Sequence, residues 1–264
     1  MDFMLGHEPQ IRLAVFVGLL VAMMAWELAA PRRGLTPGRG RRWPANLGIV
    51  VVNTIVVRLA VPVLPVGVAH WAAGEGWGLL NQVTVPPPLA VIAALLALDL
   101  IIFAQHIVFH KVPALWRLHR MHHADTGFDV TTGVRFHPIE ILLSIAIKAA
   151  AVVALGAPAA AVMIFEVVLS ATSLFNHGNV RMPASLDGLL RLVVVTPDMH
   201  RVHHSSTRAE TDSNFGFNLP WWDRIFGTYR AQPLGGHDAM EIGLPQFRDP
   251  GEQRLDKLLA QPFK

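Results

Sequence analysis

The sequence predicts an all-α protein, a polytopic membrane helical bundle with a cytoplasmic, histidine-rich metal-binding cap. Hydrophobic residues make up 52% of its 264 residues and charged residues only 16%. Globular chains carry roughly 25% charged residues, so this chain is short of water-soluble surface. Its apolar residues form runs long enough to cross a bilayer, and its histidines cluster in the polar stretches beside them.

Composition also excludes several kinds of site. The chain has no cysteine, which excludes disulfides, thiolate zinc sites, iron–sulfur clusters and cysteine-ligated haem. The formal net charge of +3 is modest and does not indicate a nucleic-acid partner.

The first apolar run, residues 13–30, follows Asp2 and Glu8 rather than the basic start of a signal peptide, so we expect a permanent anchor. The loop after it is rich in arginine, and the positive-inside rule places such a loop in the cytoplasm. Its arginines are Arg32, Arg33, Arg39, Arg41 and Arg42. We therefore expect a multi-pass protein with its N-terminus outside, and the composition favours a bacterial plasma membrane.

Residues 46–71 are the second predicted span, kinked by two prolines, and residues 89–109 return to the cytoplasmic side. Each span carries one charge, Arg58 or Asp99, at nearly matching depth. Because an unpaired charge inside a bilayer is costly, we hypothesise an Arg58–Asp99 ion pair. The alternative is that Asp99 serves a metal site below it.

Residues 139–175 form another hydrophobic block, which Gly156 and Pro158 divide into two runs. We expect a helical hairpin, either re-entrant or fully spanning, that returns to its starting side. Glu166 inside it needs a partner or an inward face.

The segment after this hairpin has the features of a membrane surface. Residues 185–195 are typical of an amphipathic interfacial helix, and Thr196 can cap a further helix. The aromatic residues of 214–229 suit either the bilayer interface or a lid over a site.

The histidines indicate a metal site. On a helix, positions i, i+3 and i+4 share one face, so three histidine clusters can each project toward one volume. Their members are His106, His110, His119, His122, His123, His200, His203 and His204. His177 is a ninth candidate, and His137 a tenth, although a His-Pro turn can be purely structural. Imidazole suits iron, copper, zinc and nickel.

The number of histidines favours two metal ions, since a single zinc ion takes about four ligands. Carboxylates near them could orient imidazole N–H groups or act as further ligands. The candidates are Asp125, Asp129, Glu140 and Asp198. We expect the isolated His7, His70 and His237 not to be ligands.

Two other functions fit a histidine-rich membrane protein. A metal-binding or metal-transport protein would distribute its ligands along a path through the bilayer, whereas these histidines gather at one face. A zinc-dependent membrane hydrolase would carry a His-Glu-x-x-His motif, which the sequence lacks.

In their order along the chain, these segments resemble the fatty acid hydroxylase superfamily, also called the sterol desaturase family. The motifs are His-x-x-x-His from His106, W-R-L-H-R-M-H-H ending at His123, R-F-H-P-I-E from Arg135, N-H-G-N-V from Asn176, T-P-D-M-H-R-V-H-H-S from Thr196 and N-F-G-F-N-L-P-W-W-D-R-I-F-G-T-Y from Asn214. The resemblance covers roughly residues 89–230, the expected catalytic domain. Residues 1–88 would be membrane spans and loops, and residues 231–264 a polar tail.

The resemblance implies a membrane oxygenase with two iron ions, which uses O₂ and two electrons to hydroxylate, or desaturate, a C–H bond of a lipid such as a sterol or fatty acyl chain. It assigns the first nine histidines to the metal and leaves His137 open. Some members have a further histidine where this chain has Ser173. We expect an external electron donor, a separate electron-transfer protein, and Arg117, Arg120 and Arg201 could dock it.

Overall fold

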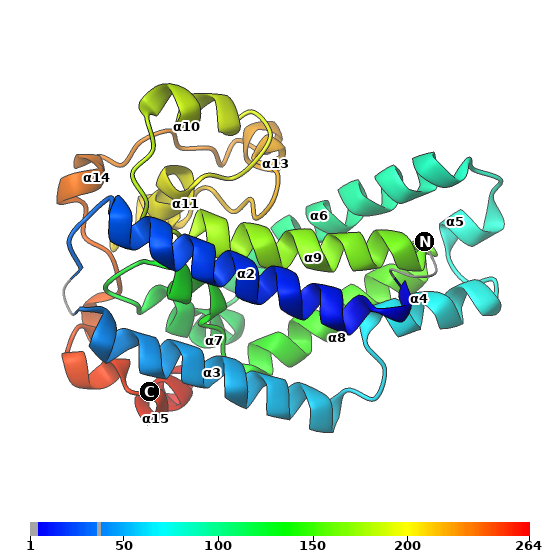
Figure 1. Cartoon of the computed structure of the whole chain (residues 1–264), viewed down its shortest axis with the longest axis horizontal. Helices are drawn as coiled ribbons and strands as arrows, with labels where there is room; N and C mark the ends of the chain where they lie inside the picture. The colour runs from blue at the N-terminus through cyan, green and yellow to red at the C-terminus, as the bar shows by residue number, and fades with distance from the viewer. Residues whose placement is uncertain (1–4, 36–37) are drawn as a thin grey trace.

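The computed structural model describes residues 5–35 and 38–264, and within them the regular secondary structure is helical. Long helices run lengthwise through the molecule (Figure 1): α2 (Glu8–Ala29), α3 (Arg39–Ala60), α6 (Pro87–Lys111), α8 (Pro138–Leu155) and α9 (Ala159–Asn176). Shorter helices gather at one end: α7 (Pro113–His123), α10 (Ala184–Leu190), α11 (Pro197–His203), α13 (Trp221–Ile225), α14 (Gly236–Ala239) and α15 (Leu255–Ala260). We call this end the cap. The predicted all-α fold is confirmed.

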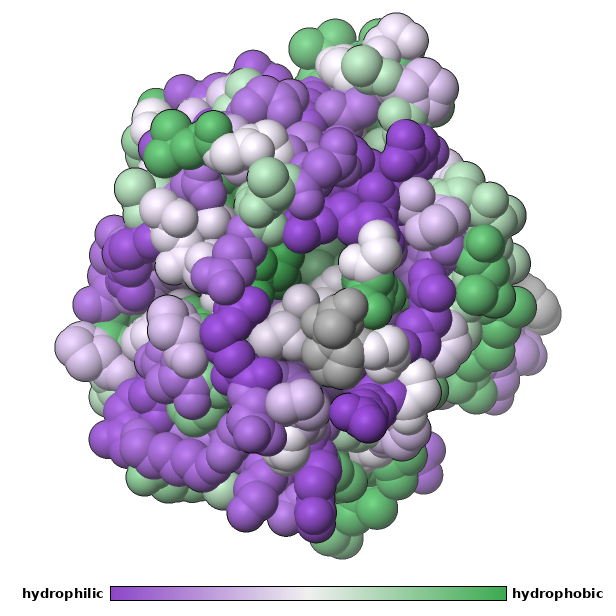
Figure 2. Space-filling view, turned by 90° about the vertical axis from the view of Figure 1, so that its left-hand side faces the viewer, coloured by the Kyte–Doolittle hydropathy of each residue, from purple (hydrophilic) through white to green (hydrophobic). Residues whose placement is uncertain are grey.

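The long helices have the surface of a multi-pass membrane protein. Among the described residues, five helical segments are long and apolar enough to cross a bilayer, namely Glu8–Ala29, Arg39–Gln82, Pro87–Lys111, Pro138–Leu155 and Ala159–Asn176. Their outer faces expose large apolar side chains such as Leu13, Val51 and Ile92, which water would not favour. The end face of the cap is instead mostly hydrophilic (Figure 2).

The second predicted span is broken rather than kinked. Helix α3 ends at Ala60, and a separate helix, α4 (Pro65–Gly74), begins after a short extended stretch. Proline lacks the backbone N–H that a continuous helix needs but suits the first turn of a new one, as Pro65 does here. A further short helix, α5 (Leu79–Gln82), then leads toward α6.

The predicted hairpin consists of α8 and α9, joined at Gly156 and Pro158. Gly156 ends α8 in the left-handed conformation, with φ of 65°, which glycine adopts without strain. Each helix has 18 residues, or about 27 Å at 1.5 Å per residue, close to the roughly 30 Å of a hydrocarbon core. Because α9 runs back toward the cap, packed against α2 and α6, His177 at its end lies in the cap.

The hypothesised Arg58–Asp99 pair is wrong. Asp99 is buried, and its Oδ2 accepts a hydrogen bond of 2.8 Å from Nε1 of Trp222 on α13. Arg58 is exposed on α3, which packs against α8. Matching depth therefore did not predict the partner, because the two side chains point toward different neighbours.

Glu166 has the partners that its burial requires. Its Oε2 lies 2.6 Å from Nη2 of Arg12 on α2, and its Oε1 accepts from Nζ of Lys148 on α8. This ionic cluster joins three of the long helices.

A buried arginine joins the long helices to the cap. Nε and Nη2 of Arg42 donate to the two carboxylate oxygens of Asp125 at 2.6 and 2.7 Å, and Nη1 donates to Asp129 at 2.7 Å. All three side chains are fully buried. Burial would raise the pKa of Asp125, but the charges of Arg42 and Arg135 outweigh it and hold that pKa well below its usual range.

Candidate metal centre

Four segments bring histidines together in the cap. His106 and His110 occupy the last turns of α6, and α7 supplies three more after a break at Pro113. His177 follows α9 directly. Helix α11 begins directly after the predicted cap residue, Thr196, whose side-chain oxygen accepts from the N–H of Met199. Its histidines complete the set.

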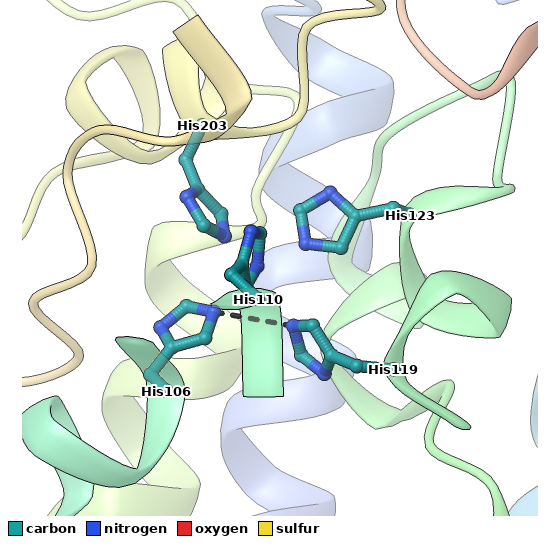
Figure 3. A group of neighbouring side chains, drawn as sticks. All are labelled: His106, His110, His119, His123 and His203. Carbon is teal, nitrogen blue, oxygen red and sulfur yellow. Dashed lines mark hydrogen bonds between the residues drawn. The ribbon is translucent and has the colours of Figure 1, made fainter. Parts of the chain in front are cut away.

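The nine expected ligands form two groups, and the members of each could supply nitrogens that lie within 4.8 Å of one another. The first group is His106, His110, His119, His123 and His203, drawn in Figure 3. The second is His122, His177, His200 and His204. All nine are buried. Neighbouring histidines on one helix thus join different groups, as His122 and His123 do.

Hydrogen bonds to one ring nitrogen orient the first group. His106 Nδ1 donates to the carbonyl oxygen of Phe215 at 2.8 Å, and His203 Nδ1 to that of Ser213 at 2.7 Å. His119 Nδ1 lies 2.6 Å from Oε1 of Glu140. Since carbonyl and carboxylate oxygens only accept, these bonds place the proton on Nδ1 and leave Nε2 as a lone-pair donor. That is the arrangement of a metal-binding histidine.

The segment that carries two of these carbonyls is itself held by Asp223. Its Oδ1 accepts from the N–H of Phe215 at 2.8 Å and its Oδ2 from the N–H of Gly216 at 2.7 Å. A further acceptor, Asp212, lies 3.4 Å from Nδ1 of His110. Sequence reasoning missed these supports. The aspartate within P-W-W-D was the available signal for one of them.

The second group has fewer outer partners. His177 Nδ1 donates to the carbonyl oxygen of Ser173 at 2.8 Å, and His177 Nε2 lies 3.1 Å from Nε2 of both His122 and His200. The Ser173 hydroxyl donates to the Gly133 carbonyl at 2.7 Å. Ser173 therefore supports His177 through its backbone carbonyl and adds no nitrogen, so this group offers four imidazoles and the other five.

Ring nitrogens without hydrogen-bond partners support a metal fit. Buried polar atoms are normally paired, and an unpaired one costs about 1–3 kcal/mol. Within the two groups, those without a partner are Nε2 of His110 and His203, Nδ1 of His122 and His200, and both ring nitrogens of His123 and His204. Imidazole nitrogens suit iron, and the two clusters suit two ions.

Burial keeps these imidazoles neutral, as metal binding requires. It lowers the pKa of both His177 and His203 to about 3. It also holds the pKa of His122, His123, His200 and His204 well below the ordinary 6.5. At neutral pH the cap therefore has few protons to release before a metal can bind.

These lowered pKa values predict an acid-sensitive metal-free protein. Below pH 6.5 the unfolded chain binds protons that the folded cap does not, so stability present above that pH is lost as pH falls toward about 3. Within this range, each such histidine lowers the free energy of unfolding by about 1.4 kcal/mol for each unit by which the pH falls. Thermal unfolding of chelator-treated protein between pH 8 and pH 5 measures this loss. A His123→Ala/His204→Ala variant should show a shallower pH dependence, and a pH-independent wild type would contradict the prediction.

The other sequence candidates lie outside both groups. The N–H of Ile139 donates to Nδ1 of His137, whose Nε2 lies 3.3 Å from the Leu259 carbonyl oxygen, so both ring nitrogens are used to cap α8 and hold the C-terminal segment. Asp125 and Asp129 bind Arg42 rather than an imidazole. Asp198 pairs with Arg201 and Arg32.

Glu140 is the one sequence candidate that supports a histidine of the two groups. Replacing it with alanine should lower metal affinity by about 10–100-fold, because His119 would lose the acceptor that fixes its tautomer and ring orientation. Glu140→Gln keeps an acceptor and should lose less. Metal titration of the chelated protein measures both, with His137→Ala as a control outside the groups. Equal metal affinity in Glu140→Ala and wild type would show that Glu140 does not support the metal site.

The arginines expected to dock an electron donor have internal partners. Arg201 is fully buried, so its role as a docking residue is wrong. Nε of Arg117 donates to the Pro262 carbonyl at 2.7 Å, and Nη2 of Arg120 to that of Gln261 at 2.6 Å. These bonds hold the last residues against α7, where sequence reasoning expected a polar tail.

A cavity of about 500 Å³ leads from the first group into the bundle between α2, α3, α6, α8 and α9. His106 and His119 line its inner end. Much of its remaining wall is apolar, including Val50, Val57, Ile102, Ile145, Leu169 and Phe217. The cavity can hold an extended apolar chain against the histidines.

Comparison with known proteins agrees with this geometry. A model of the fatty acid hydroxylase family matches residues 91–228, more than half of the chain. The chain belongs to this family. No solved structure matches it.

Several relatives in the family are lipid-oxidising enzymes by name. The chain is 34% identical to an ornithine lipid hydroxylase of Rhizobium tropici over 67% of its own length and 51% of that protein. It is 29% identical to the alkylglycerol monooxygenase of Homo sapiens over 53% of this chain and 30% of that one. It is also 29% identical to the cholesterol 25-hydroxylase of Rattus norvegicus over 72% of this chain and 63% of that one. The chain thus spans 30% to 63% of these relatives.

Proposed function

We propose that this protein is a membrane-bound lipid oxygenase that uses O₂ and two electrons to hydroxylate, or desaturate, a C–H bond, and that its catalytic domain is residues 89–230. The observation that carries the proposal is the pair of buried histidine groups at the inner end of an apolar cavity. The family and the names of its relatives support the same class of reaction.

Each of the two histidine groups would hold one iron ion, through five imidazoles in the first group and four in the second. When bound, the two ions would activate O₂ with two electrons from a separate electron-transfer protein. Glu140, together with the carbonyls of Phe215 and Ser213, fixes the ring orientations, so little reorganisation is needed when metal binds.

The chain's own contribution is to position the substrate and exclude water. Apolar walls between the long helices would align a lipid chain with one carbon beside His106 and His119. Phe136 stacks on His122 at a centroid distance of 4.4 Å, and it also lines the cavity. It would therefore shield the second group from the cavity and restrict access to it.

We also propose that the cap lies in the cytoplasm with the N-terminus outside, which agrees with the arginine-rich loop before α3 and the hydrophilic end face (Figure 2). Gathering of all nine histidines at one end disfavours a metal-transport path along the bundle.

Isotope labelling tests the proposed reaction. Cells that produce the protein should release a lipid product heavier by one ¹⁸O atom when grown under ¹⁸O₂ but not in H₂¹⁸O. Lipid extracts analysed by mass spectrometry measure this, with the His123→Ala variant as the control. Label entering from water would indicate a hydrolase or hydratase instead, and a new double bond without label would indicate desaturation.

A further inference from the structure

The cavity has a charged end far from the histidines. Beyond its apolar wall it is lined by Arg12, Arg58, Lys148 and Glu166. Glu166 lies eleven residues before His177 on α9, which is about 16 Å along the helix axis. A second cavity of about 500 Å³ lies between α2 and α3 and shares Arg12, Arg58 and Glu166 with the first. The shared residues place the two cavities side by side, and the exposed Leu13 and Arg58 lie where the second cavity meets the lipid-facing surface; we call this place the opening.

The charges at this opening do not balance. Arg12 pairs with Glu8 at 2.7 Å and with Glu166 at 2.6 Å, and Lys148 also pairs with Glu166. Two cations, Arg12 and Lys148, therefore share two carboxylates, and Arg58 adds a third positive charge. Within residues 5–35 and 38–264, Arg58 makes no ion pair. Of the three cations that line this end of the cavity, Arg58 is therefore the one without a paired carboxylate.

General features of helices explain how Arg58 is tolerated. It sits in the last turn of α3, where the helix dipole favours a cation, and its long side chain can reach toward the interface. Neither feature explains why Arg58 also lines the cavity that extends to His106. An intramembrane cation on a substrate path normally has a functional partner, and a guanidinium matches carboxylate or phosphate oxygens with two parallel hydrogen bonds.

We propose that Arg58, with Arg12 beside it at the opening between α2 and α3, binds the anionic head group of the lipid substrate, a carboxylate or a phosphate. The proposal rests on the proposed lipid oxygenation and narrows its substrate class. The head group stays at the charged end while the chain extends along the apolar wall, so the carbon presented to His106 and His119 lies well down the chain.

Equilibrium binding to the purified protein in an uncharged maltoside detergent tests this. Pairs of labelled lipids with the same chain are compared, namely palmitate with methyl palmitate, and lysophosphatidate with monoacylglycerol. Wild type should bind one anionic lipid at least about 10-fold tighter than its neutral counterpart, or about 1.4 kcal/mol. The preferred pair identifies the head group.

Arg58→Gln should abolish this preference without unfolding the protein, because the residue makes no ion pair that would be lost. Arg58→Lys should keep part of it. The matched control is Arg41→Gln, which removes an exposed arginine at the opposite end of the same helix. Equal binding of charged and neutral lipids by wild type, or an undiminished preference in Arg58→Gln, would overturn the proposal.

This binding measurement needs neither electrons nor turnover, so it separates the two proposals. A protein that selects anionic lipids through Arg58 yet incorporates no oxygen from ¹⁸O₂ would refute the oxygenase and keep the head-group site. Oxygen incorporation from ¹⁸O₂ without a preference for anionic lipids would refute the head-group site and keep the oxygenase.

Discussion

Alanine at His123 or at His204 is expected to reduce lipid oxidation at least roughly 100-fold, the upper end of the loss seen when a supporting residue around a metal is removed. The two rings stack across the two groups, with centroids 4.5 Å apart. Neither ring makes a hydrogen bond through either nitrogen. Their loss therefore breaks no protein hydrogen bond, and a loss of activity reports on the metal rather than on polar contacts.

Each variant should affect its own group. His123→Ala should lower the metal content of the first group and His204→Ala that of the second, and each should retain about one ion per chain if the groups fill independently. His70→Ala, an exposed histidine far along the sequence from the clusters, is the control. Activity near the wild-type level in either cluster variant would show that the two groups do not act together.

Replacing Arg42 with methionine is expected to destabilise the protein by about 3–5 kcal/mol, since it leaves the buried Asp129 without its cation and Asp125 with only Arg135, 3.8 Å away. Asp125 and Asp129 would lose the three charge-assisted bonds that join the loop before α8 to α3. Thermal unfolding in detergent measures the loss. Arg41→Met is the matched control, because Arg41 precedes Arg42 in the sequence but is exposed. An equal effect of both substitutions would contradict a structural role for the buried network.

The same network should resist acid. The folded pKa of Asp125 is depressed, so its contribution is present above the ordinary aspartate pKa of 3.8 and is lost only as pH falls toward the lower folded value. The acid sensitivity expected between pH 6.5 and about 3 would then arise from the histidines, and Arg42→Met should not remove it.

Local periodicity made much of this site predictable. Histidines spaced by three and four residues share a helix face, and the alternating apolar runs place the clusters at one end. The nine residues expected to bind metal do converge. Periodicity could not assign His122 and His123 to different groups, because that depends on how α7 crosses α11 and the end of α9.

Long-range partners were the part that the sequence did not predict. Depth along two spans suggested that Arg58 meets Asp99, but Trp222 from a distant segment reaches Asp99 instead. The arginine-rich loop suggested only membrane orientation, yet Arg42 turns inward and holds the loop that precedes α8. Backbone carbonyls such as that of Phe215 have no sequence signature at all, although they set the tautomer of His106.

The metal content of the purified protein tests the central claim most directly. Protein produced with ample iron and purified in detergent should contain close to two iron ions per chain by mass spectrometry, one for each histidine group. The His123→Ala/His204→Ala variant should lose both. One zinc ion, or no bound metal, in a wild-type protein that remains folded would contradict a two-iron centre.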